Sequence, residues 1–438
     1  MTQLSGWGRS VWSPATIEHP KDAAGVAARV TSAGPRGVLA RGLGRSYGDA
    51  AMASGGTVLR LDAFHDIGPI SDAGVVEVGA GVSFRELIAN LVPQGWFVPV
   101  TPGTQHVTMG GALASDVHGK NHHRDGTFGR HVDWVELVDG TGQSRRLDAG
   151  DPLFGAVAGG MGLSGVMTRM AVRGIPVDSD TITVHTTRTR DLDETMAVLQ
   201  SDDAVHPYTV AWVDTLAAGS AAGRGVVTSG DHTPAGAATG GKASKTFGSA
   251  VPAPLWAPSG LLNRWSVRAF NEAYFRRAPA RPTVAPASIP SFFHPLDVVD
   301  GWNRMYGARG FLQYQIAVAD AEVVRTVLDL LRREHVTTFL AVLKRFGPAV
   351  GGPLSFPIPG WTLALDIPVG AGVAPVLERA DDLVVAAGGR TYFAKDSRVR
   401  PELVPVMYPR LGEWRALRDE LDPSGVFVSD LARRLSLC

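Results

Sequence analysis

Alternating apolar and polar positions predict several short strands in the first third of the chain. TVLRLDAF (residues 57–64) and VVEVGAG (75–81) follow this pattern, and RGVLA (36–40) is a short apolar run between turn residues. Such segments are typical of half-buried strands. DWVELVDGTGQSRRL (133–147) repeats the alternation on both sides of an Asp-Gly pair, which predicts a hairpin.

One segment of this region has helical spacing instead. In GVSFRELIANLV, the apolar residues Phe84, Leu87 and Leu91 share one helical face, and Ser83 and Glu86 have the spacing of a capping box. Together with the strands, this helix predicts that residues 1–178 form one α+β unit.

The middle of the chain predicts a second unit of strands and helices. Strands are expected at TITVHTTRTR, YTVAWVDT, GFLQYQIAV, TTFLAVLKRFG and WTLALDIPV, and helices at DAEVVRTVLDLLRREH and GVAPVLERADDLVVAAGG. Residues 231–254 show no periodicity, and we expect a mobile region over about 215–290. The fold class is therefore α+β with two domains, the expected organisation for 438 residues.

The composition excludes some classes of protein. Basic and acidic residues number 42 each, so nothing at whole-chain level suggests a nucleic-acid partner. The single cysteine, Cys438, excludes intrachain disulfides and cysteine-based metal clusters. No apolar run approaches the roughly 18 residues of a membrane span, and the N-terminus lacks the pattern of a signal peptide. We expect a soluble protein, with attachment to a membrane surface left open.

Two glycine-rich segments suggest an anion site. RGLGRSYGDA, residues 41–50, has small residues whose backbone amides can converge on an anion between Arg41 and Arg45, although a plain turn explains it too. In TPGTQHVTMGGALASDVHGKN, Gly110 and Gly111 open a short helix whose N-terminus can meet phosphate oxygens. The two segments together predict a pyrophosphate held between loops. GMGLSG (160–165) matches GxGxxG, but it lies between a predicted helix and a strand, the reverse of the dinucleotide-binding order.

The stretch SDVHGKNHHRDG (115–126) allows three interpretations. His118, His122 and His123 have the residue types of a zinc site, but no glutamate accompanies them, and the glycine and asparagine between them disfavour a helix. A solvated polar loop is the second interpretation, and the wall of a cofactor pocket is the third.

Other candidates lie in the second half. Gln313 and Gln315 are two apart on a predicted strand, so they share one sheet face and suggest hydroxyl recognition in a pocket, unless that face is exposed. Trp212, Trp361 and Phe346 are expected in the core. Lysine occurs at six positions, among them Lys120, Lys344 and Lys395, and burial can lower the pKa of such a group. By itself Lys395, in YFAKDSR, is equally well explained as a surface lysine paired with its charged neighbours.

The two glycine-rich segments resemble the flavin domain of the vanillyl-alcohol-oxidase (p-cresol methylhydroxylase, PCMH) superfamily. Within it, the chain is similar to the decaprenylphosphoryl-ribose 2-oxidase family, and the similarity continues through FFHPLD, GFLQYQ, LKRFGP, PLSFPIPGW, AKDSR and SDLARRL. The resemblance implies an FAD domain (1–178) that is completed by residues 390–438, with an antiparallel-sheet substrate domain (179–389) between them.

The resemblance also implies the cofactor site. Members that bind flavin covalently carry a histidine where this chain has Arg45, so we predict non-covalent FAD. The predicted FAD-binding residues are Ala40, Arg41, Gly42, Leu43, Gly44, Arg45, Ser46, Tyr47, Gly48, Asp49, Ala50, Gly103, Thr108, Met109, Gly110, Gly111, His118, Gly119, Lys120, Asn121, Val166 and Tyr392.

Catalysis and substrate binding are inferred in the same way. Oxidation of a secondary alcohol by hydride transfer requires that the hydroxyl proton leave as well, and the resemblance implies Lys395 for this role, with Tyr47 or His118 nearby. The predicted substrate residues are Gln313, Tyr314, Gln315, Lys344, Ala364 and Lys395. Several family members carry a cysteine at position 364, so covalent capture through a thiol is absent here, and Thr362 changes local contacts too.

The function implied is FAD-dependent oxidation of the ribose 2-hydroxyl of decaprenylphosphoryl-β-D-ribose to a 2-keto sugar, the first half of an epimerisation that supplies cell-wall arabinan. An NAD(P)H-dependent keto-reductase is the implied partner, and the cell envelope, peripheral to the plasma membrane, is the implied location. We expect the mobile region to receive the polyprenyl tail. Competing hypotheses are an aldonolactone or sugar-alcohol oxidase that uses O2, a metal-dependent hydrolase at His118 and His122, and a non-catalytic scaffold.

Overall fold

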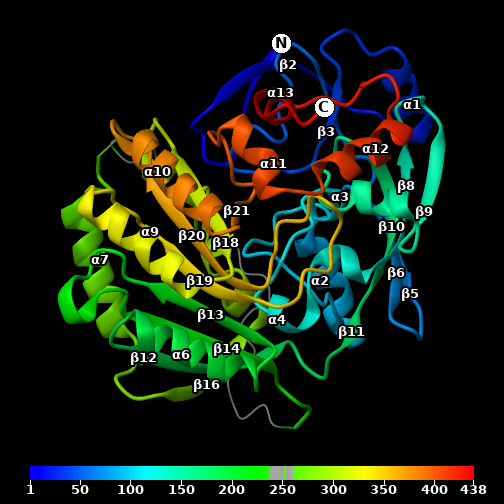
Figure 1. Ribbon diagram of the computed structural model, residues 1–438. Coiled ribbons are helices and arrows are strands. Elements are labelled where there is room, and N and C mark those ends of the chain that lie inside the picture. The colour runs from blue at the N-terminus through cyan, green and yellow to red at the C-terminus, as the bar shows by residue number, and fades with distance from the viewer. Residues whose placement is uncertain (237–250, 253–257, 259) are drawn as a thin grey trace.

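The computed structural model describes residues 1–236, 251–252, 258 and 260–438 (Figure 1). Within these residues, the N-terminal part contains a sheet of order β1-β2-β4-β3 and an antiparallel sheet of order β5-β6-β10-β8-β9. Their strands are β1 Thr2–Ser5, β2 Trp12–Glu18, β3 Val38–Arg41, β4 Thr57–Arg60, β5 Ile67–Ile70, β6 Val75–Gly79, β8 Val132–Val138, β9 Ser144–Asp148 and β10 Val166–Arg173.

A larger antiparallel sheet forms the second part of the described chain. Its order is β16-β12-β14-β13-β19-β20-β18-β21. Its strands are β12 Thr181–Thr189, β13 Tyr208–Val213, β14 Gly225–His232, β16 Thr283–Ser288, β18 Phe311–Val318, β19 Ala341–Phe346, β20 Gly360–Pro368 and β21 Arg390–Thr391. Two short pairs join β7 Trp96–Phe97 with β11 Ile175–Pro176, and β15 Val251–Pro252 with β17 Val299–Asp300.

Helices α6, α9 and α10 cover the outer face of the large sheet (Figure 1). Their apolar stripes, such as Val324, Val327 and Leu331 of α9, form a second hydrophobic core against that face. In the described residues no helix has the length and apolar character needed to cross a bilayer. The α-helices are α1 Ala23–Thr31, α2 Phe84–Leu91, α3 Met109–Ala114, α4 His122–Asp125, α5 Pro152–Val157, α6 Leu192–Asp203, α7 Arg264–Arg277, α8 Ile289–Phe293, α9 Ala321–Arg333, α10 Val373–Ala386, α11 Val404–Met407, α12 Leu411–Leu421 and α13 Asp430–Leu435. The 3-10 turns are Val92–Gln94, Phe128–His131, Gly219–Ala221, Pro295–Val298, Trp302–Tyr306 and Pro401–Leu403.

The C-terminal segment returns to the N-terminal part. The Trp414 indole on α12 donates to the carbonyl of Ala156 on α5 at 3.1 Å, and Phe427 bridges to Val38 of β3. Figure 1 shows α11, α12 and α13 beside the N-terminal strands, with both termini in the same region. These contacts fit the proposed assignment of residues 390–438 to the first domain, and the exact domain boundaries stay a prediction.

The sequence patterns give the element types correctly in most places. The capping box of Ser83 and Glu86 is present at the start of α2, and the strands and helices expected in the second unit are all formed. The region of about 215–290 contains β14, α7 and β16 in its described part, and its mobility stays a prediction. The aperiodic stretch 231–254 falls mainly on residues 237–250 and 253–257, which lie outside the described residues.

Candidate active site

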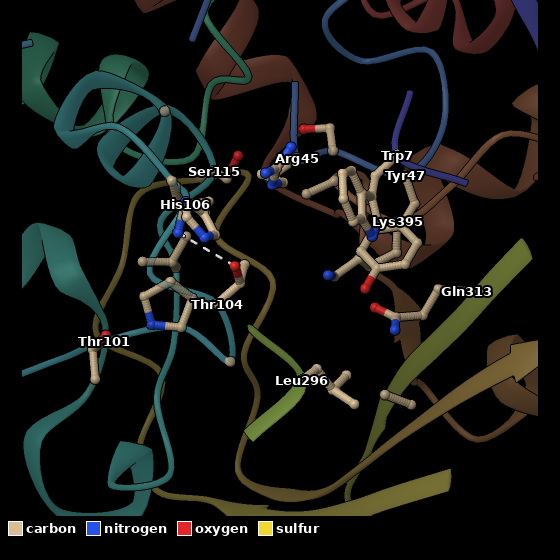
Figure 2. Close-up of a pocket in the computed structure, with 18 of the residues that line it drawn as sticks. Trp7, Arg45, Tyr47, Thr101, Thr104, His106, Ser115, Leu296, Gln313 and Lys395 are labelled. Carbon is tan, nitrogen blue, oxygen red and sulfur yellow. Dashed lines mark hydrogen bonds between the residues drawn. The ribbon is translucent and has the colours of Figure 1, made fainter. Parts of the chain in front are cut away.

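A cavity of about 830 Å³ lies between the inner face of the large sheet and the loops of the N-terminal part. The segment after β3, the α3 region and the turn before Lys395 form one side, and β13, β18, β19 and β20 form the other. Figure 2 shows Arg45, Tyr47 and Lys395 converging on this space from one side and Gln313 from another.

The two glycine-rich segments meet at the start of α3. A side chain at Gly42 would clash with the Thr108 side chain, its Cβ lying only 2.3 Å from Oγ1, so glycine lets this loop pack against the helix cap. In the described part of the chain, the amides of Leu43, Gly44, Arg45 and Ser46 donate no intramolecular hydrogen bond. Free amides beside a helix N-terminus suit a phosphate anion.

Most of the predicted FAD-binding residues line the cavity. Those in its wall are Ala40, Arg41, Gly42, Leu43, Gly44, Arg45, Ser46, Tyr47, Ala50, Gly103, Thr108, Gly110, Gly111, His118, Gly119, Lys120 and Tyr392. Met109 and Val166 are fully buried in the core behind it, and the Asn121 amide donates to the Pro99 carbonyl. These three do not contact the cavity, so direct contact with FAD is not supported for them.

Gly48 and Asp49 also lie outside the cavity wall, in a structural role. A Cβ at Gly48 would lie 1.8 Å from the carbonyl oxygen of Asp396. The Asp49 carboxylate accepts two hydrogen bonds from Arg434 at 2.8 and 2.9 Å, and Arg434 also contacts Asp396. This buried ion cluster fastens the glycine-rich loop to the turn that carries Lys395 and to the last helix, so their role in FAD binding is indirect.

His118 is a buried neutral imidazole in the cavity wall. Burial, followed by the nearby Lys344, His122 and Lys395, lowers its pKa well below the usual value. Nε2 lies 3.0 Å from the Gln315 amide nitrogen, which donates to it, so Nδ1 carries the proton. Nδ1 is buried and has no partner in the described residues, as expected of a group that awaits a ligand.

His122 and His123 have other surroundings. His122 is buried, accepts a hydrogen bond from the amide of Gly347 and packs on the Phe346 ring. His123 approaches Asp203 at 3.5 Å. The solvated-loop interpretation is therefore wrong for His122.

Lys395 faces the cavity beside an aromatic ring and a carboxyl group. Its Nζ lies 3.9 Å from the centre of the Tyr47 ring. Burial lowers its pKa to about 7, an effect that Asp366 opposes and Lys344 reinforces. Burial likewise raises the pKa of Asp366 to about 7, although Gln313 donates to its carboxylate at 2.5 Å. The surface-lysine interpretation of Lys395 is wrong.

Two further lysines enter the same cavity. The Lys120 ammonium donates to the Phe292 carbonyl at 2.5 Å, and the Lys344 ammonium donates to the Gly119 carbonyl at 3.2 Å. Burial lowers their pKa values to about 7 and about 8. Neither has a carboxylate partner among the described residues.

The inner face of β18 and β20 carries the polar groups predicted for the substrate. Gln313, Gln315 and Ala364 all line the cavity, which excludes the exposed-face alternative. Tyr314 points the other way, into the core against α10 beside Asp381, so a substrate contact is not supported for it. Trp361 is in the core as expected, Phe346 packs on His118, and Trp212 is buried as expected but also forms part of the cavity wall.

Sequence reasoning missed several lining residues. Asp366 had a usable signal: it is a lone acid in an apolar strand, two positions from Ala364 and therefore on the same face. Trp7, Trp302 and Tyr306 come from distant segments, and nothing local in the sequence marks them. They form the aromatic wall next to Tyr47.

The residues of the cavity thus fit FAD: among the described residues, the amides of the glycine-rich loop and Nδ1 of His118 have no hydrogen-bond partner, and the space around Gly103 is open. The family profile of the FAD binding domain matches residues 14–148, and that of D-arabinono-1,4-lactone oxidase matches residues 370–435. The decaprenylphosphoryl-beta-D-ribose oxidase of Mycolicibacterium smegmatis is 40% identical over 99% of this chain and 97% of its own. An uncharacterised Streptomyces coelicolor protein is 40% identical over 81% of this chain and all of its own. The alditol oxidase of a Streptomyces species is 24% identical over 99% of both chains.

Proposed function

The chain belongs to the family of decaprenylphosphoryl-beta-D-ribose oxidase and is an FAD-dependent oxidoreductase, and we propose that it oxidises the ribose 2-hydroxyl of a polyprenylphosphoryl ribose, with decaprenylphosphoryl-β-D-ribose as the expected substrate. The product is the 2-keto sugar, formed in the first half of an epimerisation. The observation that carries this proposal is the pair Lys120 and Lys344, two buried amino groups that face the cavity and have no carboxylate partner among the residues that the structure describes.

A buried ammonium without an anion is costly, so such groups are retained where a ligand supplies the negative charge. A phosphate group on the substrate supplies it, and a free sugar does not. Lys120 and Lys344 therefore favour a phosphorylated substrate. Because the resemblance assigned Lys120 to FAD and Lys344 to the substrate, the pair is expected to lie where the two ligands meet.

Of the three candidate catalytic residues, Lys395 is the best suited to accept the hydroxyl proton. Burial raises the pKa of Tyr47 well above its usual value, so the phenol stays protonated. The Nε2 lone pair of His118 is occupied by Gln315. With a pKa of about 7, Lys395 is partly neutral at physiological pH and can act as a base. Bound FAD supplies the acceptor for the hydride.

We propose that the flavin is held without a covalent bond. The residue at the position of the attachment histidine is Arg45, whose guanidinium lies 4.0 Å from the centre of the Trp7 ring. A guanidinium is not a nucleophile toward flavin, and here it closes the cavity beside the glycine-rich loop.

The decisive experiment compares substrates under anaerobic conditions. Purified enzyme is mixed with a polyprenylphosphoryl ribose, with ribose 5-phosphate and with free sugar alcohols, and bleaching of the flavin is followed. Reduction by the lipid-linked sugar alone supports the proposal. Reduction by free sugars, with peroxide formed in air, would favour the aldonolactone or sugar-alcohol oxidase, an alternative that the match of residues 370–435 keeps open.

We further propose that the protein works at the surface of the plasma membrane, where a polyprenyl substrate resides, and that α7 is the element that contacts it. Its outward face carries Trp265, which is 78% exposed, followed by Ala269 and Ala273 one and two helical turns further on. Phe270 and Tyr274 are 44% and 42% exposed and also line the cavity, so they lie at its mouth. An apolar stripe with arginines along it is typical of an interfacial helix.

The charge of α7 suits an anionic bilayer. Its sequence, RWSVRAFNEAYFRR, holds four arginines and one acid, Glu272, which pairs with Arg276 and Arg224. The tail-docking role expected for residues 233–250 falls mostly outside the described residues. An NAD(P)H-dependent keto-reductase that returns the ketone to an alcohol, and a location at the cell envelope, complete the proposal by family resemblance.

A further inference from the structure

Three ligand-type side chains converge on the outer face of the large sheet, on the side away from the cavity. They are His185 of β12, Asp231 of β14 and His206 in the loop between α6 and β13. One donor atom from each lies within 4.8 Å of the other two. The Asp231 carboxylate oxygen is 2.6 Å from Nδ1 of His206 and 3.9 Å from Nε2 of His185.

The fold fixes the positions of these groups. In the β12–β14 pairing His185 is opposite Ser229 and Asp231 is opposite Thr183, so His185 and Asp231 are diagonal neighbours on one face. Both backbone polar groups of His206 have partners. Its amide donates to the Asp202 carbonyl at 2.7 Å, and its carbonyl lies 3.2 Å from Nε2 of His123. The site is therefore built from three separate elements.

Two imidazole nitrogens and one carboxylate oxygen form a ligand set that Zn²⁺ prefers. With bonds of about 2.0–2.2 Å, tetrahedral ligands lie about 3.3 Å apart. The two distances from Asp231 fall on either side of this value, and no two of the three donor atoms are more than 4.8 Å apart, so side-chain rotations bring them within reach of one ion. Asp231 has no lysine or arginine partner in the described residues. The side chains are 35%, 15% and 37% exposed for His185, His206 and Asp231, which leaves room for a water as fourth ligand.

We propose that His185, His206 and Asp231 form a structural site for a divalent transition metal, with Zn²⁺ as the preferred ion. The metal joins β12, β14 and the loop before β13. The opposite faces of the same strands carry Val184, Val210 and Thr228, which line the cavity. The bound ion therefore stabilises the sheet wall of the cavity without contacting the substrate, and this inference does not depend on the identity of the substrate.

The test uses untagged holoenzyme treated with a chelator and then passed into metal-free buffer. Isothermal titration with ZnCl2 should show one site per chain, and saturating Zn²⁺ should raise Tm by a few degrees. Co²⁺ should give the visible absorption of a tetrahedral site with mixed nitrogen and oxygen ligands. His206→Ala and Asp231→Asn should each weaken Zn²⁺ binding more than about tenfold, with turnover unchanged.

His19→Ala is the matched control, because His19 pairs with Asp62 at 2.9 Å on the surface and lies outside the three-residue cluster. Zn²⁺ binding that is retained in His19→Ala and lost in the two site variants supports the proposal. Absence of binding to wild type, or equal binding by His206→Ala and Asp231→Asn, would overturn it. If one site variant fails to fold, His185→Gln provides the same comparison.

Discussion

The Lys395 ammonium lies over the Tyr47 ring, with Nζ 3.9 Å from the ring centre. The aromatic face stabilises a cation, while burial disfavours it, and the result is a lysine whose pKa of about 7 lets it exist in both forms near neutral pH. This balance is what the proposed catalytic role requires.

Lys395→Met should slow flavin reduction by the substrate by about a hundred- to ten-thousand-fold, because the proton acceptor is removed. Anaerobic stopped-flow absorbance measures the rate directly. Lys395→Arg separates two roles: arginine keeps the cation but does not deprotonate, so it should fail like methionine if Lys395 is a base. An arginine variant that keeps wild-type rates would instead assign charge stabilisation, and wild-type rates in both variants would indicate that Lys395 takes no part in turnover.

Flavin reduction should accelerate as pH rises through about 7, as neutral Lys395 forms. Asp366 raises the pKa of Lys395 through its negative charge, so Asp366→Asn should move the inflection to lower pH. The measurement is the pH dependence of the reduction rate in both proteins. A rate that falls as pH rises in the wild type would contradict the base assignment.

The sequence predicted the elements of this site better than their geometry. Gln313 and Gln315 could be assigned to one face because strand periodicity is local, and Ser83 and Glu86 identified a helix start for the same reason. The aromatic wall could not be found, because Trp7 and Trp302 meet only after residues nearly 300 apart pack together. The pKa of Lys395 is equally non-local, since it depends on burial by the whole fold.

The family resemblance supplied residues, and the structure separates direct from indirect roles among them. Asp49 belongs to the matched motif, yet it holds Arg434 instead of lining the cavity. Tyr314 lies between two glutamines that line the cavity, and the two-residue period turns it to the other face. A motif match alone does not distinguish these cases.

Lys120→Met and Lys344→Met should weaken binding of the phosphorylated substrate without destabilising the fold. Loss of a charge-assisted hydrogen bond costs about 1.5–3 kcal/mol, or roughly tenfold to a hundredfold in affinity. Removing an unpaired buried charge should leave Tm unchanged or raise it. Substrate titration of flavin fluorescence and thermal unfolding provide the two readouts. A large fall in Tm with unchanged affinity would assign these lysines a structural role.

Acid precipitation should release the flavin into the supernatant, because Arg45 replaces the attachment residue. Absorbance from the near ultraviolet to the blue region, recorded before and after precipitation, measures the released fraction. Flavin retained in the pellet would show a covalent bond formed elsewhere, and the neighbouring Tyr47 and His106 would be the first residues to examine.

The contact of α7 with lipid predicts binding to vesicles that contain phosphatidylglycerol, and weaker binding to phosphatidylcholine alone. Arginines near an anionic surface contribute about 1 kcal/mol each, so Arg268→Ala and Arg277→Ala should each reduce binding about fivefold, and salt should weaken it. Trp265→Ala should reduce binding to both lipids because the apolar contact is lost. Trp12→Ala is the matched control, since Trp12 is also an exposed tryptophan (49%) but lies on β2. Flotation of the holoenzyme with vesicles measures each effect, and turnover of a short-chain, water-soluble substrate should remain normal in every variant. If the α7 variants float like wild type, the helix is not the lipid contact. If the same variants also no longer pass their product to a keto-reductase, the exposed face of α7 binds a protein instead.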